Sequence, residues 1–343
     1  MHLPIATGSS VPRSLSGAGR LFDAQGRRIS YLRLSVTDRC NFRCGYCSPA
    51  NWAGKGRLLA VGEILRLVSV FVSRGVDRVR LTGGEPLLRR DLPDIARGIA
   101  SMSGVEEVCL TTNGDRLASM AAELKRAGVS VVNVSLDTLD KGRFREVTKR
   151  GDLTRVLRGL EAAAKVGFAR LGVNAVVQAG VNDAPEALAA LARRSWSLGA
   201  VPRFIERMPF AGEGEAVPSV EVRRRLERAG IACERGGVRA GAGPATYYRA
   251  TDGGRPAGEI GFIGAMTESF CAGCNRVRIS ATGDLRACLG GRSEAPLAAL
   301  LRGGAGDGEL EGAIRAALLV KWEGHRFVED GGRGLLPMMG IGG

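Results

Sequence analysis

Residues 31–47 read YLRLSVTDRCNFRCGYC, and this stretch decides the fold class. Tyr31–Thr37 is a short β-rich run, and Cys40, Cys44 and Cys47 follow it with the spacing C-x3-C-x2-C. In α/β folds with parallel strands, functional residues gather at the carboxyl ends of the strands. The stretch therefore predicts a strand that ends in a cysteine-bearing loop at a functional site.

The alternation of strand and helix repeats along the chain to about residue 210. Segments with apolar residues at three- and four-residue spacing, such as Ile64, Leu65, Val68, Phe71 and Val72, predict helices between the β-rich runs. The predicted strands are Tyr31–Thr37, Arg78–Thr82, Glu107–Thr112, Val129–Leu136, Gly172–Gln178 and Pro202–Met208. Six βα units predict an α/β fold, and we expect a partial, open six-unit βα barrel because a closed barrel needs eight units.

From about residue 236 the pattern changes to short strands joined by turns, which predicts a C-terminal α+β region. Ala245–Ala250 and Glu259–Ile263 flank a turn, and Arg276–Ser280 and Leu285–Cys288 are typical of a hairpin. One helix around Glu309–Val320 precedes the tail. The expected parts are an N-terminal arm over 1–30, the barrel over 31–235 and a cluster-binding region over 236–343.

Composition and charge limit the classes of protein. The chain has 343 residues, of which 45% are apolar, and no apolar run approaches a membrane span. The first 30 residues lack the apolar segment of a signal peptide, so we expect a cytoplasmic protein. The net charge is +14, but only 6 of the 49 basic residues are Lys. An Arg-rich composition and a real anionic partner explain that charge equally well.

Six of the eight cysteines fall into two groups of three, whereas Cys109 and Cys233 stand alone and are typical of buried residues. The first cysteine group consists of Cys40, Cys44 and Cys47. Three thiolates on one loop can hold three irons of a [4Fe–4S] cluster and leave the fourth iron open to a substrate or cosubstrate. A structural zinc site would need a fourth ligand nearby, and the two His, His2 and His325, are far away in sequence.

The first cysteine group, with Tyr46 before its last member, resembles the motif of the radical S-adenosylmethionine (SAM) enzymes. The resemblance extends to Gly83-Gly84-Glu85-Pro86 after the second predicted strand. Glycines there let the backbone approach a ligand closely, and Glu85 can accept a hydrogen bond from an ammonium group. The resemblance implies that SAM contacts Tyr46, Gly84, Glu85, Thr111, Ser135 and Met208.

The second cysteine group, Cys271, Cys274 and Cys288, has the spacing C-x2-C-x13-C and again no obvious fourth ligand. A zinc ribbon is an alternative, because C-x2-C is a common half of a zinc site. Arg276 and Arg278 follow Cys274, and the alternation of a strand puts both on one face beside the cysteines. Two guanidinium groups there favour an anionic or heteroaromatic ligand, the alternative being a solvated basic strand.

From about residue 17 to the C-terminus the chain resembles the GTP 3′,8-cyclase family of molybdenum cofactor biosynthesis. The shared pieces are the first cysteine group, GGEP, NVSLD, VPRFIERMP, FCAGCNRVR and the terminal IGG. The resemblance implies two [4Fe–4S] clusters, of which one cleaves SAM and the other binds the guanine of GTP, and a tail that reaches the active site. It also implies that Arg33, Arg276 and Arg278 are catalytic and, together with Arg80, contact the substrate.

The reaction that the resemblance implies is radical cyclisation. A 5′-deoxyadenosyl radical takes the ribose 3′ hydrogen of GTP, and the C3′ radical closes onto C8 of guanine. Reduction of the cyclised radical by one electron, with uptake of a proton, then gives 3′,8-cyclo-7,8-dihydro-GTP. Two positions depart from the family, with Arg78 and Gly172 where it often has Lys. We expect Arg170, or another of the many arginines, to supply the charge missing at position 172. At 335–337 the tail reads LLP, where the family usually has an Arg.

Two other functions are compatible with parts of the sequence. One is a radical SAM maturase with an auxiliary cluster, and the other is a basic zinc protein that binds nucleic acid. The missing fourth ligands and the lack of an aromatic stacking platform argue against the latter. We therefore expect GTP, an electron donor and a downstream cyclic pyranopterin monophosphate synthase as partners, and neither membrane nor nucleic acid. The sequence leaves the oligomeric state open, a homodimer included.

Overall fold

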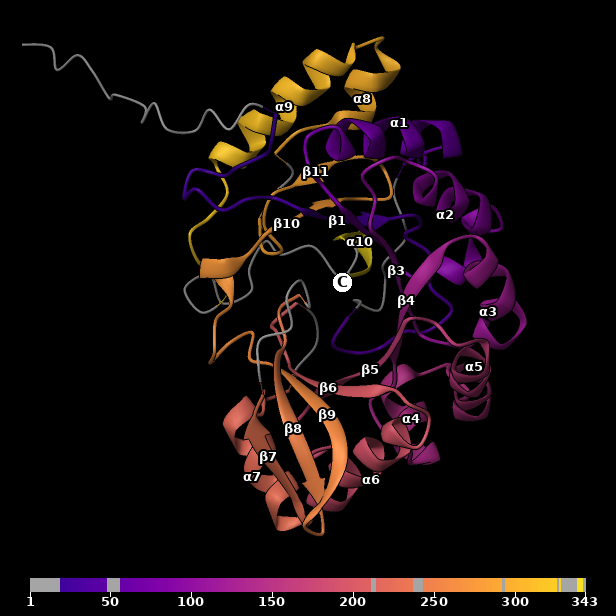
Figure 1. The fold of residues 1–343 in the computed structure, drawn as a ribbon, viewed down its shortest axis with the longest axis vertical. Helices are drawn as coiled ribbons and strands as arrows, with labels where there is room; N and C mark the ends of the chain where they lie inside the picture. The colour runs from indigo at the N-terminus through magenta and orange to yellow at the C-terminus, as the bar shows by residue number, and fades with distance from the viewer. Residues whose placement is uncertain are drawn as a thin grey trace, which may run out of the picture.

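The computed structural model describes residues 19–47, 56–210, 214–236, 243–291, 294–325, 327 and 338–341. They form one eleven-stranded sheet with helices packed on it (Figure 1). The strands are β1 (Tyr31–Ser35), β2 (Arg78–Thr82), β3 (Glu107–Thr112), β4 (Val129–Ser135), β5 (Arg170–Val177), β6 (Val201–Glu206), β7 (Ile231–Arg235), β8 (Thr246–Asp252), β9 (Arg255–Ile263), β10 (Arg276–Ile279) and β11 (Leu285–Arg286). No helix of the described ranges has the length and apolar character to cross a membrane.

The sheet is an open, mainly parallel βα structure, as the sequence predicts. The strand order is β11-β10-β1-β2-β3-β4-β5-β6-β9-β8-β7. Strands β1 to β6 run parallel, and each lies within a few residues of its predicted position. Since β11 and β7 are the two edges of the sheet and do not pair with each other, the barrel stays open. The predicted fold class is confirmed.

Helices cover the outer face of the parallel strands (Figure 1). They are α1 (Val61–Val72), α2 (Leu92–Ala100), α3 (Leu117–Arg126), α4 (Lys141–Thr148), α5 (Leu153–Val166), α6 (Pro185–Trp196), α7 (Ser219–Arg228), α8 (Leu297–Arg302), α9 (Asp307–Leu319) and the short α10 (Met338–Ile341). The apolar face of α1, with Ile64 and Phe71, belongs to the same buried core as Leu32 and Leu34 of β1. Alternation along β1 therefore leaves Tyr31 and Arg33 for the inner face of the barrel.

The pairing of the C-terminal strands is the main feature that the sequence did not predict. The expected hairpins exist, because β8 pairs antiparallel with β9 and β10 pairs antiparallel with β11. However, β9 also pairs parallel with β6, and β10 pairs parallel with β1. The sheet thus continues across the predicted boundary at residues 235 and 236. Parallel pairing joins strands that are distant in sequence, so local patterns do not reveal it.

Both ends of the described chain contact loops that join the strands and helices of the barrel. Leu21 is buried, and its amide donates to the Arg74 carbonyl at 3.2 Å, so the part of the predicted arm that the structure describes packs on the barrel. At the other end, the Met338 amide of α10 donates to the Cys47 carbonyl at 3.1 Å. The tail therefore contacts the loop that carries the first cysteine group. Residues 335–337 and Gly342-Gly343 lie outside the described residues.

Candidate active site

The first cysteine group lies on the loop after β1 and is held by its own chain. The Cys47 amide donates to the Cys44 carbonyl at 3.0 Å, and the Phe42 amide donates to Cys40 Sγ at 3.4 Å. Phe42 is buried and packs edge-on against Phe144 of α4, with 6.0 Å between the ring centroids. One buried aromatic side chain in the polar stretch Asn41–Gly45 thus anchors the cysteine loop to the helical layer.

Burial dominates the ionisation of the thiols of this group, although Arg43 donates to the Cys40 carbonyl at 2.6 Å and acts against it at Cys40. Burial raises the pKa of Cys40 to about 11. Burial, followed by the charges of Asp137, Cys47 and Cys40, raises the pKa of Cys44 well above its usual value. Bound iron would supply the positive charge that these thiolates need.

The motif C-x3-C-x2-C offers one thiolate to each of three irons of a cluster. In the described ranges no three Cys, His, Asp or Glu side chains converge as ligands of one metal ion. The mutual effect of the Cys40, Cys44 and Cys47 charges nevertheless shows that these three are neighbours. A [4Fe–4S] cluster binds each thiolate to a different iron, so its ligands stand farther apart than those of tetrahedral zinc. The first cysteine group therefore suits an iron–sulfur cluster.

The GGEP loop packs directly on the cysteine loop. A Cβ at Gly83 would lie 2.3 Å from the Thr37 carbonyl oxygen, and one at Gly84 would lie 2.2 Å from the Arg39 carbonyl oxygen. Hydrogen bonds of 2.7 Å from the Gly84 and Glu85 amides to these two oxygens fix the contact. The sequence predicts that these glycines allow a ligand to approach. The structure adds that they allow the two loops to approach each other.

Glu85 fixes the end of the neighbouring strand. Its buried carboxylate accepts hydrogen bonds from Thr112 Oγ1 at 2.6 Å, from the Asn113 amide at 2.6 Å and from the Leu87 amide at 3.0 Å. Burial outweighs these hydrogen bonds and raises the pKa of Glu85 to about 7. The predicted contact of Glu85 with an ammonium group stays a prediction, and the carboxylate already holds the GGEP loop against β3.

The other predicted SAM residues lie around the same strand ends, except for one. Thr111 Oγ1 accepts from Arg80 Nη1 at 3.1 Å, and the Tyr46 hydroxyl donates to Asp137 Oδ2 at 2.8 Å. Ser135 is the last residue of β4 and is half-buried. Met208 instead lines the pocket of the second cysteine group. Their contacts with SAM stay predictions.

Asp137 is a site residue that sequence reasoning missed. It accepts from Tyr46 and, at 2.8 Å, from the Val176 amide, and burial raises its pKa to about 6. Its place directly after the predicted strand, in the motif NVSLD, was the available signal.

The second cysteine group surrounds a pocket between β10, β11 and the segment after α9. Cys271 and Cys274 precede β10, Cys288 follows β11, and all three line the pocket together with Arg276 and Arg278. Cys274 Sγ lies 3.6 Å from Arg276 Nη2 and 3.7 Å from Lys321 Nζ. Burial alone would raise the pKa of Cys274, but these two cations lower it to about 6.

Arginines from different strands meet inside the barrel. Strand register places Arg278 beside Arg33 and Arg33 beside Arg80. Burial, together with the charges of Arg80, Arg276 and Arg203, lowers the pKa of Arg33 to about 10 although Tyr31 acts in the opposite direction. Burial, then Arg33 and Arg276, lowers the pKa of Arg278 well below its usual value. Such a concentration of buried like charge is costly without an anionic ligand. We call Arg33, Arg80, Arg203, Arg276 and Arg278 the arginine chamber.

Arg203 is the member of the chamber that the sequence did not single out. It lies in β6 and lines a pocket with Arg78, Arg80 and Arg170. Its buried Nε has no hydrogen-bond acceptor in the described part of the chain. The sequence did not single out Arg203, because strand alternation puts many arginines of this Arg-rich chain in equivalent positions.

The space beside Gly172 is taken by Arg203. A Cβ at Gly172 would lie 2.8 Å from Asn133 Oδ1 and 3.3 Å from Arg203 Nη2. Arg170 lines the same pocket, but its guanidinium forms an ion pair with Glu107. The expected compensation by Arg170 stays a prediction, and Arg203 is a second source of charge at that place.

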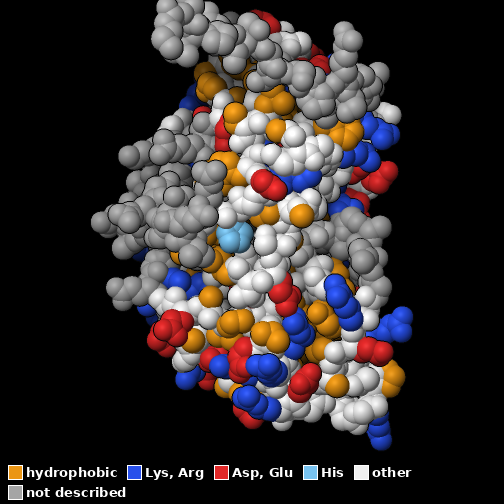
Figure 2. Space-filling view, turned by 90° about the vertical axis from the view of Figure 1, so that its left-hand side faces the viewer, with side chains coloured by type: hydrophobic (Ala, Val, Ile, Leu, Met, Phe, Trp, Pro, Cys, Tyr) orange, Lys and Arg blue, Asp and Glu red, His pale blue; other side chains and the backbone are white. Residues whose placement is uncertain are grey.

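The remaining surface charge and cysteines have structural explanations. On the face in Figure 2, Lys and Arg side chains are interspersed with Asp and Glu side chains. Ion pairs such as that between Arg193 and Asp252 offset part of the positive charge. Cys109 is fully buried and Cys233 packs against the core, which agrees with the structural interpretation of both.

Comparisons with known proteins place the chain in a family. A profile of the Radical SAM superfamily matches residues 34–192, and one named Molybdenum Cofactor Synthesis C matches residues 201–327. A GTP 3′,8-cyclase of Rhizobium etli is 42% identical, with 96% of this chain and 95% of the relative covered. One of Pelotomaculum thermopropionicum is 41% identical over 94% of this chain and 99% of the relative. The chain belongs to the GTP 3′,8-cyclase family.

Membership of the GTP 3′,8-cyclase family brings SAM and [4Fe–4S] clusters as cofactors, which confirms the prediction from the cysteine spacing. It also excludes the zinc-dependent nucleic-acid protein. Among solved structures, Streptococcus suis SuiB bound to its precursor peptide SuiA aligns with a TM-score of 0.62 at 16% identity, over 91% of this chain and 75% of SuiB. At that identity the likeness supports the fold only.

Proposed function

We propose that this chain converts GTP to 3′,8-cyclo-7,8-dihydro-GTP, the first step of molybdenum cofactor biosynthesis, by radical SAM chemistry. Cys40, Cys44 and Cys47 would hold the cluster that binds SAM, and the second cysteine group would hold the other. When bound, these cofactors supply the electron and the carbon radical. The residues of this chain bind, orient and enclose the substrate.

The arginine chamber is the observation that carries the choice of substrate. Arg276 and Arg278 line the pocket of the second cysteine group, whereas Arg80 and Arg203 line the adjoining pocket inside the barrel. Arg33 lies close to members of both sets. A nucleoside triphosphate combines a base and an extended anion, and guanidinium groups bind phosphate oxygens in a bidentate manner. GTP would place its base at the second cysteine group and its phosphates toward Arg80 and Arg203.

The finer roles follow from the same arrangement. Arg33, Arg276 and Arg278 would contact the substrate and stabilise charge that develops during cyclisation. Tyr46, Gly84, Glu85, Thr111, Ser135 and Met208 would contact SAM, with Met208 reaching it from the opposite wall. The proposal includes a cytoplasmic location, an electron donor that reduces the clusters, and a cyclic pyranopterin monophosphate synthase that consumes the product. A homodimer is compatible with it.

The proposal is tested by measuring whether SAM cleavage depends on GTP and on the arginine chamber. We expect anaerobically reconstituted protein with SAM and a reductant to form 5′-deoxyadenosine much faster with GTP than without it. Arg203→Met should raise the KM for GTP about tenfold or more, because a charge-assisted hydrogen bond contributes about 1.5–3 kcal/mol.

Arg170→Met is the matched variant, since Arg170 lines the same pocket but is paired with Glu107. A rise in KM for Arg170→Met with none for Arg203→Met would instead assign the missing charge to position 170. Equal 5′-deoxyadenosine with and without GTP would contradict GTP as the substrate.

A further inference from the structure

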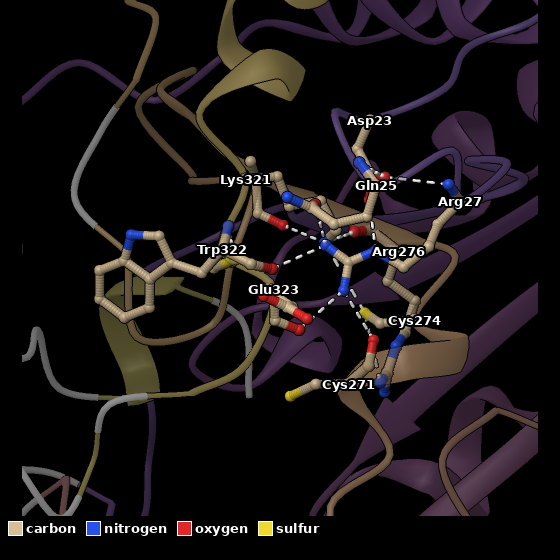
Figure 3. Close-up of polar contacts among 11 residues, drawn as sticks. Asp23, Gln25, Arg27, Cys271, Cys274, Arg276, Lys321, Trp322 and Glu323 are labelled. Carbon is tan, nitrogen blue, oxygen red and sulfur yellow. Dashed lines mark hydrogen bonds and ion pairs between the residues drawn. The ribbon is translucent and has the colours of Figure 1, made fainter.

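Arg27 joins three separate segments at the second cysteine group (Figure 3). Its Nε donates to Asp23 Oδ2 at 2.6 Å. Its Nη1 donates to the carbonyls of Cys271 at 2.7 Å and Glu323 at 3.0 Å. Its Nη2 donates to the Trp322 carbonyl at 2.6 Å and to Gln25 Oε1 at 2.8 Å. All five N–H groups of the guanidinium are therefore used, in a planar geometry that Lys cannot reproduce.

A buried aspartate and a left-handed glycine fix the turn that carries Arg27. Asp23 is fully buried, and its Oδ1 accepts from the amides of Gln25 at 3.0 Å and Arg27 at 2.9 Å. Gly26 has a φ of 73°, a left-handed conformation that favours glycine. The Asp23 carboxylate both shapes the turn and offsets the charge of Arg27, whose side chain is only 9% exposed. Arg27 therefore contributes geometry more than net charge.

The segment 321–323, which Arg27 holds, contacts two of the three cysteines of the second group. Lys321 Nζ donates to the carbonyls of Arg276 at 2.8 Å and Ala287 at 2.6 Å and lies 3.7 Å from Cys274 Sγ. The Trp322 amide donates to Cys288 Sγ at 3.2 Å. Because Arg27 binds the Cys271 carbonyl directly, all three cysteines are tied to one network that begins at the N-terminal turn.

We propose that Arg27, with Asp23, is a positioning residue for the second cysteine group, which it arranges to receive its cluster. This inference rests on the proposed function, because it takes that group to be the site of the second cluster. The five hydrogen bonds of Arg27 go to Asp23, Gln25 and three backbone carbonyls, and Arg27 also lines the pocket of the second cysteine group. Its loss should therefore impair the second cluster and spare the first, whose cysteines lie on a different loop.

The experiment uses the full chain reconstituted anaerobically with iron and sulfide. Two [4Fe–4S] clusters give about eight irons per chain. We expect Arg27→Lys, which keeps the charge but not the five donors, to fall toward about four irons and to lose the GTP-dependent change in the electron paramagnetic resonance spectrum. SAM cleavage without GTP, which reports the first cluster, should persist. Arg28→Lys is the control, because Arg28 is the next residue and pairs with Asp77 at the surface.

Several outcomes would overturn the inference. Full iron content and an unchanged spectrum in Arg27→Lys would show that the network does not position the cysteines. Loss of both clusters would show a general structural role instead. Asp23→Asn, which keeps the side-chain shape, should give a milder loss of iron than Arg27→Lys, and the reverse order would contradict the role assigned to the guanidinium. If the unaltered protein binds only about four irons, the proposed function itself fails, which is a distinct result.

Discussion

The two cysteine groups have the same number of thiols, but Cys274 of the second group differs from the rest in its electrostatic surroundings. Burial raises the pKa of Cys288 in the second group, as it does those of Cys40 and Cys44 in the first. In the first group, burial raises the pKa of Cys40 to about 11, with Glu85 acting in the same direction and Arg43 against it. Around the second group, Arg276 and Lys321 outweigh burial and lower the pKa of Cys274 to about 6. Burial thus decides the pKa of Cys40, whereas two neighbouring cations decide that of Cys274.

The surroundings of the two cysteine groups suit different ligands. The first group faces the GGEP loop and a set of hydrogen-bonding strand ends, which suit a zwitterionic cosubstrate. The second group adjoins the arginine chamber, whose charges also serve an anionic substrate. Guanidinium and ammonium groups beside a cluster thus have two effects, stabilising thiolate and attracting anion.

The strongest test of the comparison removes one cysteine from each group. Cys40→Ser should abolish SAM cleavage altogether, because the first cluster loses one of its three ligands. Cys271→Ser should retain SAM cleavage but lose GTP cyclisation. Both are measured as 5′-deoxyadenosine and cyclised product under anaerobic conditions. Cys233→Ser, outside both groups, is the control and should behave as the unaltered protein. Normal cyclisation by Cys271→Ser would show that the second group is assigned wrongly.

A second test uses the thiols of the metal-free protein. At pH 7 a thiol of pKa 6 is about nine-tenths thiolate, whereas one of pKa 11 is about one part in ten thousand. Lower basicity also lowers nucleophilicity. We therefore expect iodoacetamide to modify Cys274 at least about tenfold faster than Cys40, as measured by peptide mass spectrometry.

The modification rates of the thiols should depend on pH in different ways. The rate at Cys274 should fall as the pH drops through about 6, because its thiolate becomes protonated. Cys233, whose pKa burial raises to about 11, should react as slowly as Cys40. Lys321→Met should slow the reaction of Cys274, since it removes one of the two stabilising cations. Equal modification rates at Cys40 and Cys274 would contradict the difference in pKa between these two thiols.

The smallest expected effect concerns how the first loop is held. Gly84→Ala forces a Cβ against the Arg39 carbonyl and should lower the free energy of unfolding by about 1–3 kcal/mol. Gly45→Ala, on the cysteine loop itself, meets no atom within 4 Å and should change the stability by less than about 0.5 kcal/mol. Denaturant unfolding of the metal-free variants measures both. A similar loss in the two variants would mean that the loops are not packed as tightly as the structure has them.

Sequence reasoning predicted the features that depend on local pattern. The six parallel strands, the open barrel, the two cysteine groups and the positions of Arg276 and Arg278 on one strand follow from periodicity and spacing. It missed Arg203 and Asp137, although both lie on or directly after predicted strands. In a chain with 43 Arg among its 49 basic residues, position on a strand does not distinguish a chamber arginine from a surface one.

The fold class, the family and the two cysteine groups proposed to hold the clusters thus follow from the sequence alone, because each depends on residues close together along the chain. Only the tertiary structure decided which arginines meet in the chamber, that β10 pairs with β1, and that Arg27 reaches the carbonyl of Cys271. Arg27 and Cys271 are 244 positions apart. Such contacts exist only after the sheet has closed the long connections between its strands, so no local pattern encodes them.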